Sequence, residues 1–145
     1  MSQIIVSDAT SLIVLEKQQR LALLCDLFEQ ILVPEKVYHE LLLGLHNDQC
    51  LSSANCITIV KISSSGRLYN LRILLDEGEA DAIELAIRKQ LPLIIDEKKG
   101  RTIAQSYGLV ITGLAGILVL SVRKKVLNSA QALDILDVAM KQGYW

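Results

Sequence analysis

Two aspartates stand directly after apolar segments that are typical of buried strands. Asp8 follows the short run at residues 4–6, and Asp96 closes the segment 91–96. A buried carboxylate is unfavourable by several kcal/mol unless it is paired with a cation or binds a metal. The sequence therefore raises the question of what neutralises each of these side chains.

Further acids fall on two predicted helices. Glu40 lies about two turns into a helix that begins at Pro34. Glu79 lies near the start of the helix that precedes the fourth predicted strand, and Asp81 follows it two positions later. Side chains two residues apart on a helix point about 200° away from each other, so both cannot face one ion well. One of these two acids is expected to be structural.

Carboxylates that cluster without histidine or cysteine suit Mg²⁺ or Mn²⁺. Clustered acids repel and raise one another's pKa values unless a divalent cation neutralises them. A bound metal lowers the pKa of its water and clamps phosphoryl oxygens, which are the two requirements of phosphodiester hydrolysis. No Ser/His/Asp or Cys/His nucleophile set is legible in the chain. The acids therefore favour metal-dependent hydrolysis.

Three basic residues follow Asp96 on the next turn and helix, namely Lys98, Lys99 and Arg101. This place suits contacts with substrate phosphates, and a solvated helix face is the plain alternative. None of these residues is expected to recognise a nucleic-acid base, so no preference for a nucleotide sequence is predicted.

Structural explanations exist for the acids as well. Asp8 after a strand can be the N-cap of a helix that begins near Thr10. Glu79 and Asp81 can be first-turn acids that the helix dipole favours, and Glu40 can be a solvated helix residue. On the residues alone, these alternatives stay open.

The composition indicates one α/β domain over residues 1–145. Half of the 145 residues are hydrophobic but only 4% are aromatic, so aliphatic side chains must make the core. A core of aliphatic side chains suits a parallel sheet with helices on both faces. The net charge of −1 gives no general attraction to nucleic acid or membrane, so such binding would need a local patch.

Strands alternate with helices along the chain, which predicts a mainly parallel sheet of about four to five strands. Ligands bind at the carboxyl edge of such a sheet, where strand order reverses, so Asp8 and Asp96 are expected on one edge. The strands are predicted over 4–6, 31–33, 57–62, 91–96 and 109–112. The helices are predicted over 11–18, 21–28, 34–44, 67–75, about 79–90, 97–107, 114–125 and 129–141.

The three cysteines, Cys25, Cys50 and Cys56, are odd in number and lack CxxC spacing. Without a signal peptide they are interpreted as reduced thiols of a cytoplasmic protein. A zinc site from His46, Cys50 and Cys56, with His39, lacks the paired rhythm of zinc ligands. The stretch 102–122 carries no charge, but its strongly apolar part is too short to span a membrane, so a soluble protein is expected.

Four segments together resemble the PIN-domain family of metal-dependent ribonucleases, in its branch of small stand-alone bacterial and archaeal proteins. They are "VSDATSLIVL", "VPEKVYHELL", "DEGEADAIELA" and "LPLIIDEKKGRTIAQSYGLVITGLAGIL". The resemblance implies a Rossmann-like three-layer α/β/α fold and RNA cleavage by a water that Mg²⁺ or Mn²⁺ activates. It also implies a homodimer, and in many members the toxin half of a toxin–antitoxin pair.

The resemblance assigns the acids residue by residue. Asp8 matches the first family aspartate, and Glu40 matches the glutamate of "V-x-x-E". The third acid is Glu79 by alignment on "LPLI" or Asp81 by the "A-D-A" tripeptide. Asp96 matches the fourth.

Two details around Asp96 and Asp8 complete this comparison. The family's "T-x-D" reads "I-I-D" before Asp96, which removes a hydroxyl and leaves Glu97 as a weaker candidate. Thr10 or Ser11 would orient Asp8 or a metal-bound water. Catalysis is thus expected from Asp8, Glu40, Glu79 and Asp96, with metal held by Asp8, Glu79 or Asp81, and Asp96.

Other function classes are compatible with this pattern. One is a PIN-like nucleic-acid-binding or regulatory module whose metal site has decayed. Another is a phospho-receiver or phosphatase-like domain with Asp8 as the phosphoacceptor, although the second aspartate of "D-x-D" is absent. The apolar helix over 114–122 can pack a dimer, receive a partner peptide or lie in the core.

Overall fold

Five parallel strands form one sheet in the part of the chain that the structure, a computed structural model, describes, residues 3–45 and 55–144. The order across the sheet is β3-β2-β1-β4-β5, and every neighbouring pair is parallel. The strands are β1 (Ile4–Ser7), β2 (Gln30–Pro34), β3 (Ile57–Val60), β4 (Leu93–Ile94) and β5 (Ile111–Thr112).

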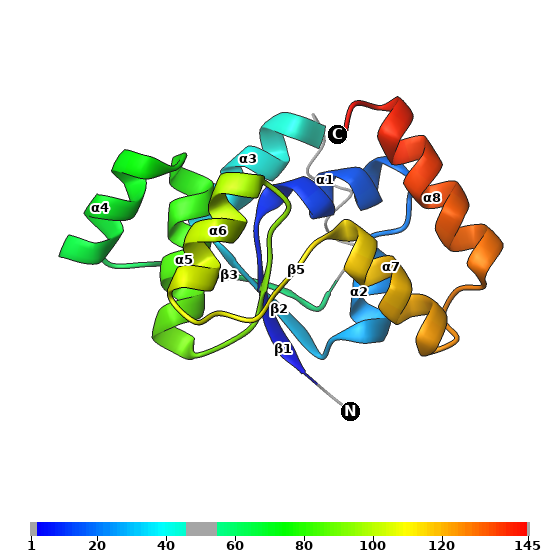
Figure 1. Ribbon diagram of the computed structural model, residues 1–145, viewed down its shortest axis with the longest axis horizontal. Coiled ribbons are helices and arrows are strands. Elements are labelled where there is room, and N and C mark those ends of the chain that lie inside the picture. The colour runs from blue at the N-terminus through cyan, green and yellow to red at the C-terminus, as the bar shows by residue number, and fades with distance from the viewer. Residues whose placement is uncertain (1–2, 46–54, 145) are drawn as a thin grey trace.

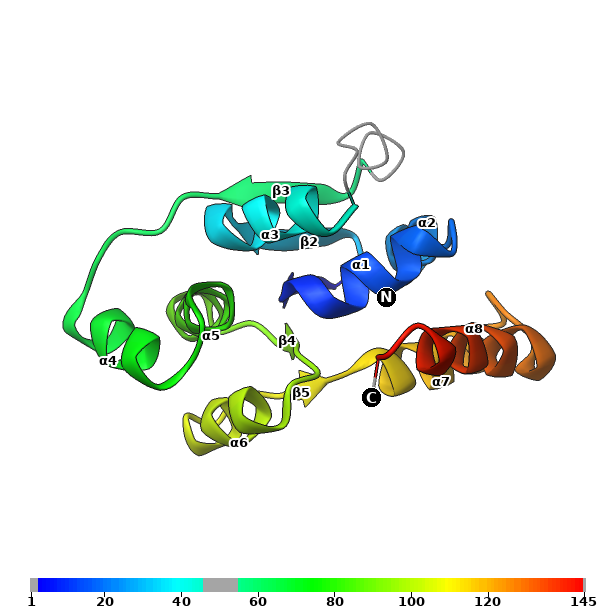
Figure 2. The ribbon, with the colours of Figure 1, turned by 90° about the horizontal axis from the view of Figure 1, so that it is seen from above.

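Helices cover both faces of this sheet. Figure 2 shows α4, α5 and α6 on one side and α2, α7 and α8 on the other. Helix α3 packs on α5 and on β2 and β3, while α1 packs on α3. The helices in the described residues are α1 (Ala9–Lys17), α2 (Ala22–Leu27), α3 (Glu35–Leu45), α4 (Gly66–Leu74), α5 (Glu77–Lys89), α6 (Lys98–Ser106), α7 (Leu114–Arg123) and α8 (Ser129–Lys141).

The strand segments are continuously apolar because helices cover them on both faces. Ile31, Val33, Leu93 and Ile94 have no exposed surface. The predicted class, a three-layer α/β/α fold with a parallel sheet, is confirmed.

Strand order reverses between β1 and β4. The chain builds β1, β2 and β3 outward in one direction, then returns to place β4 on the other side of β1. Val6 pairs with Leu93 and Ser7 with Ile94, and the Asp8 amide donates to the Ile94 carbonyl at 2.9 Å. Figure 1 shows β1 rising from the N-terminal end to α1, so the carboxyl ends of the strands lie at the upper edge. Asp8 and Asp96 therefore emerge there from adjacent strands.

Several element boundaries differ from the sequence prediction, and two of the differences lie beside the site. Helix α5 begins at Glu77 rather than near Glu79, because the Asp76 side chain caps it by accepting from the Glu79 amide at 2.8 Å. Strand β4 spans two residues instead of six, so Asp96 stands two residues beyond its end.

The prediction of reduced cysteines is wrong for two of the three. Cys25 on α2 and Cys56 before β3 form a disulfide with a Cα–Cα distance of 5.6 Å. Sequence spacing could not show this pairing, because it depends on α2 lying beside the entry to β3. The bond removes Cys56 from the zinc hypothesis, and it removes the support that reduced thiols gave to a cytoplasmic location. His39 is exposed, and His46 and Cys50 lie outside the described residues.

Helix α7 covers the apolar end of the uncharged stretch 102–122. It has 10 residues, about half of what a bilayer requires. None of the helices in the described ranges is long and apolar enough to cross a membrane.

The disulfide should stabilise the chain mainly by restricting its unfolded state. It closes a loop of 31 residues, for which chain-entropy arguments give about 4 kcal/mol. Cys25→Ser is expected to lower the free energy of unfolding by about that amount, measured by urea denaturation without reductant. Excess reductant should bring the native chain down to the level of the variant. Equal stability of the two chains without reductant would contradict the bond.

Candidate functional site

Asp8 is buried at the end of β1 without the partner that its position suggests. It is the N-cap residue of α1, but its side chain makes no capping hydrogen bond. The side chain is 4% exposed, and Oδ1 has no hydrogen-bond partner among the described residues. Burial raises the pKa of Asp8 to about 7, the Ala9 amide opposes this, and Glu40, Asp76 and Asp96 add repulsion. Capping therefore does not explain this carboxylate.

Glu79 faces the same region from the first turn of α5. Its Oε2 is buried and unpartnered within the described residues. Burial raises its pKa to about 10, helped by side-chain hydrogen bonds with Asp76 and Glu97 and by repulsion from Asp76 and Asp8. A pKa this high means that the carboxyl is protonated at neutral pH unless a cation joins it.

Glu40 reaches the cluster from α3. Burial, followed by repulsion from Asp76, raises the pKa of this half-buried side chain, while the Gly78 amide opposes the shift. A Cβ atom on Gly78 would overlap Oε1 of Glu40, so only glycine leaves room for the carboxylate here.

Asp76 belongs to this cluster and was missed at the sequence level. It raises the pKa values of Asp8, Glu40 and Glu79. The sequence prediction placed the start of helix α5 near Glu79, so Asp76 was not considered as part of the site. An aspartate that precedes an acidic first turn is an N-cap signal, and this signal points to Asp76.

Asp96 is held by donors from three separate elements. Oδ1 accepts from the Leu114 amide at 2.9 Å and from the Tyr144 hydroxyl, and Oδ2 accepts from the Ser11 hydroxyl. Thr10 or Ser11 was expected to orient Asp8 or a metal-bound water, and the Ser11 hydroxyl instead donates to Asp96. Ser11 and Tyr144 supply the side-chain hydroxyls that "I-I-D" lacks.

Asp81 lies outside the cluster of unpaired acids, which corrects its proposed metal role. It is 2% exposed, and Nε and Nη2 of Arg72 both donate to it at 2.9 Å. Glu84, one turn later on α5, is paired in the same way with Arg67 and Arg88. The pairs made by Arg67 and Arg72 attach α4 to α5 and give Asp81 a structural role, so Glu79 is the one of the two candidates that stays without an arginine.

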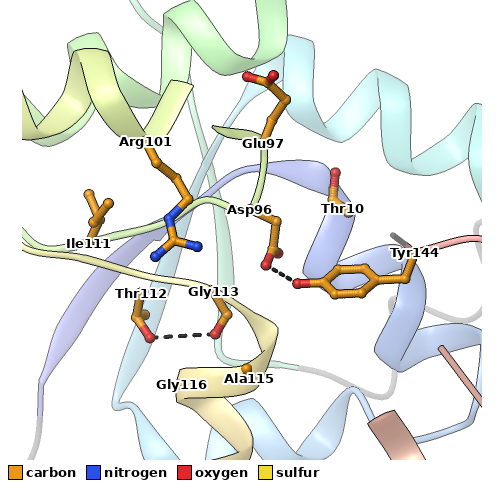
Figure 3. Close-up of a pocket in the computed structure, with 10 residues that line it drawn as sticks. All are labelled: Thr10, Asp96, Glu97, Arg101, Ile111, Thr112, Gly113, Ala115, Gly116 and Tyr144. Atoms are coloured by element: carbon orange, nitrogen blue, oxygen red, sulfur yellow. Dashed lines mark hydrogen bonds between the residues drawn. The ribbon is translucent and has the colours of Figure 1, made fainter. Parts of the chain in front are cut away.

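A pocket of about 380 Å³ opens beside Asp96. Figure 3 shows the Arg101 side chain and the Tyr144 ring on opposite sides of it, with Thr10 and Glu97 at its rim. The floor is formed by residues of β5 and the start of α7, namely Ile111, Thr112, Gly113, Ala115 and Gly116.

The remaining predicted residues are placed as follows. Arg101 is a lining residue of the pocket, and so is Thr10. Lys98 and Lys99 are exposed at the start of α6 and do not line it. Glu97 caps α6 by accepting from the Gly100 amide at 2.7 Å, a bond that lowers its pKa, so it serves the helix and Glu79.

The chemistry of the cluster fits a divalent cation. Asp8 and Glu79 each present a buried oxygen without a partner among the described residues, and burial, followed by neighbouring acids, raises the pKa of both carboxyls. Hard carboxylate oxygens of this kind suit Mg²⁺ or Mn²⁺. Among residues 3–45 and 55–144, no three acidic, histidine or cysteine side chains are gathered closely enough to hold an ion as they stand. Asp8 and Glu79 would hold the ion, with Asp96 and Glu40 beside them.

Comparison with known families decides the classification. A family model described as "DUF3368: PIN domain" matches residues 4–145. The chain belongs to the PIN-domain family. PIN domains are commonly nucleases and typically use divalent metals, which agrees with the donor chemistry of Asp8 and Glu79.

A solved structure shares the PIN fold at low sequence identity. It is a PilT N-terminus domain protein from the hyperthermophilic archaeon Sulfolobus solfataricus P2, with a TM-score of 0.52 and 14% identity. The match covers 81% of this chain and 89% of that protein, and at this identity it supports the fold alone. Comparison with curated protein sequences gave no significant match.

Removing the Asp8 charge should stabilise the metal-free protein at high pH. The folded pKa of about 7 lies above the ordinary value of 3.8, so folding binds a proton and stability falls as pH rises through this range. Asp8→Asn is therefore expected to raise the melting temperature by several degrees at about pH 8 and by less at about pH 5. Asp134→Asn, an exposed change on α8, serves as the control. An equal effect of Asp8→Asn at both pH values would contradict the assignment.

Variants of Glu79 and Asp81 should differ in Mn²⁺ affinity and in stability. Asp81→Asn weakens the partner of Arg72, which is expected to lower the free energy of unfolding by about 1–3 kcal/mol and leave Mn²⁺ affinity unchanged. Glu79→Gln should lower Mn²⁺ affinity about tenfold or more without loss of stability. Calorimetric titration and urea denaturation of both variants give the comparison. The reverse pattern would assign the site to Asp81.

Proposed function

We propose that this PIN domain is a Mg²⁺- or Mn²⁺-dependent endoribonuclease. The observation that carries the proposal is the pair of buried, unpartnered carboxylate oxygens of Asp8 and Glu79 at the point where strand order reverses. Two other buried acids of α5, Asp81 and Glu84, are paired with arginine. An acid cluster that the fold leaves without cations is the pattern expected of a metal-dependent hydrolase.

Each acid has a distinct task in this proposal. A bound cation supplies an activated water and stabilises charge on the phosphoryl oxygens. Asp8 and Glu79 would hold the cation, and both carboxyls would be deprotonated when they do so, against the raised pKa values that burial gives them. Asp96, fixed by its donors, contributes a third carboxylate from the neighbouring strand. Glu40 is half-buried with a raised pKa, which suits it to orient the attacking water and accept its proton.

The substrate backbone is expected to enter the pocket beside Asp96. Arg101 points into this pocket, where its guanidinium is suited to hold a phosphate. Lys98 and Lys99 are exposed on the same helix and extend the positive charge outward. These contacts would position a single-stranded or structured RNA without reading its sequence.

The toxin role and the homodimer stay predictions of the family resemblance. In this proposal an antitoxin or a second copy covers the apolar groove between α7 and α8. The groove has a volume of about 500 Å³, and its exposed side chains include Val119 and Leu133. An exposed apolar surface of this kind is typical of a protein contact.

A second candidate function is a non-catalytic binding module. It is favoured by the finding that no three potential ligands converge within the described residues. This module would bind nucleic acid through Arg101, Lys98 and Lys99 and would show no saturable Mn²⁺ binding. Calorimetric titration with Mn²⁺ therefore separates the two functions.

Purified protein is expected to cleave RNA with Mn²⁺ or Mg²⁺ and to stop on addition of EDTA. Asp8→Asn should abolish cleavage while the folded state persists, because it removes one of the two carboxylates whose unpartnered oxygens would hold the cation. Asp134→Asn makes the same chemical change at an exposed position and should keep full activity. Undiminished cleavage by Asp8→Asn, or cleavage in EDTA, would rule out the mechanism.

A further inference from the structure

Tyr144 enters the site from the far end of the chain. Its hydroxyl donates to Oδ1 of Asp96, across 48 positions in sequence. We propose that Tyr144 is a positioning residue, whose hydroxyl fixes the Asp96 carboxylate for metal binding and RNA cleavage. This inference rests on the proposed nuclease function and adds a residue that the four family segments do not include.

The place of Tyr144 is set by a regular helix ending. Gly143, with φ of +88°, follows α8 in the left-handed conformation that glycine adopts without strain. The Gly143 amide donates to the Met140 carbonyl at 3.1 Å, and the Tyr144 amide donates to the Ala139 carbonyl at 3.0 Å. These two bonds form a Schellman motif, which fixes the direction of the chain after the helix. The backbone of Tyr144 is thus anchored to α8.

The rest of the fold directs this anchored residue to Asp96. Helix α8 packs on α7, and the first amide of α7, that of Leu114, is the other donor to Oδ1. Two packed helices therefore meet the same carboxylate oxygen, one at its start and the other just beyond its end. Figure 1 shows the end of α8 at the upper edge, where the strands end.

The surroundings leave Asp96 little freedom. Ser11 holds Oδ2, and a Cβ on Gly113 would lie 2.5 Å from Oδ1. The Leu114 amide and the Ser11 hydroxyl hold Asp96 from α7 and α1, and Tyr144 lies beside it in the pocket. Removing a hydrogen-bonding partner of a metal-binding carboxylate typically lowers metal affinity or activity 10–100-fold, which sets the expected size of the effect.

Tyr144→Phe removes only the hydroxyl and is the direct test. Mn²⁺ affinity, measured by calorimetric titration, is expected to fall about tenfold, and kcat for RNA cleavage should fall while KM stays near the native value. Tyr69→Phe makes the same change on the exposed face of α4 and should alter neither quantity. Thermal melting of both variants checks that the fold is intact.

Gly143→Ala provides a second variant that keeps the hydroxyl. An added Cβ meets no atom within 4 Å, so the change acts through the positive φ and shifts the direction of Tyr144. It should lower Mn²⁺ affinity and kcat in the same direction as Tyr144→Phe. Together the variants test the position of the hydroxyl and its presence separately.

Three results would overturn the inference. Unchanged Mn²⁺ affinity and kcat in Tyr144→Phe would make the hydrogen bond irrelevant to the site. Tighter Mn²⁺ binding by this variant would mean that Tyr144 obstructs Asp96 instead of positioning it. Native protein that shows no saturable Mn²⁺ binding would overturn the nuclease proposal itself, a result visible before any variant is compared.

Discussion

Electrostatic repulsion among carboxylates that are removed from water is the constraint on which this site depends. The parallel pairing of β1 with β4 brings Asp8 and Asp96 to one edge of the sheet, and α3 and α5 add Glu40, Asp76 and Glu79. Burial alone disfavours the charged form of Asp8, and its neighbours disfavour it further. This repulsion at the carboxyl edge of the sheet lowers the stability of the folded chain, as is common at functional sites.

The same helix shows how the protein treats acids that serve structure. On α5, Asp81 receives both donors of Arg72, and Glu84 receives Arg67 and Arg88. These partners lie on α4 or on α5 itself, and they neutralise carboxylates that α5 buries. Glu79, on the same helix, has no such arginine among the described residues. On this one helix, the acids paired with arginine stabilise the fold, and the unpaired acid faces the candidate site.

Local pattern was enough to predict the strands, most of the helices and the edge where Asp8 and Asp96 meet. Buried parallel strands are continuous apolar runs, and the carboxyl ends of such strands share one edge. The hydrogen-bond and disulfide partners of particular side chains could not be predicted from local sequence, because they come from distant segments. Ser11 reaches Asp96 across 85 positions, and Cys25 reaches Cys56 across 31. Spacing on α5 showed that only one of Glu79 and Asp81 could face an ion, but the choice required the position of Arg72.

The proposed mechanism requires that Asp8 and Glu79 share a divalent cation. Anomalous diffraction from a crystal soaked in Mn²⁺ tests it most directly, because the signal locates the metal without assumptions about the ligands. A shared ion should give a peak within about 2.5 Å of the oxygens of both Asp8 and Glu79. A crystal without a peak at this edge of the sheet, or with manganese bound only at other acids, would contradict it.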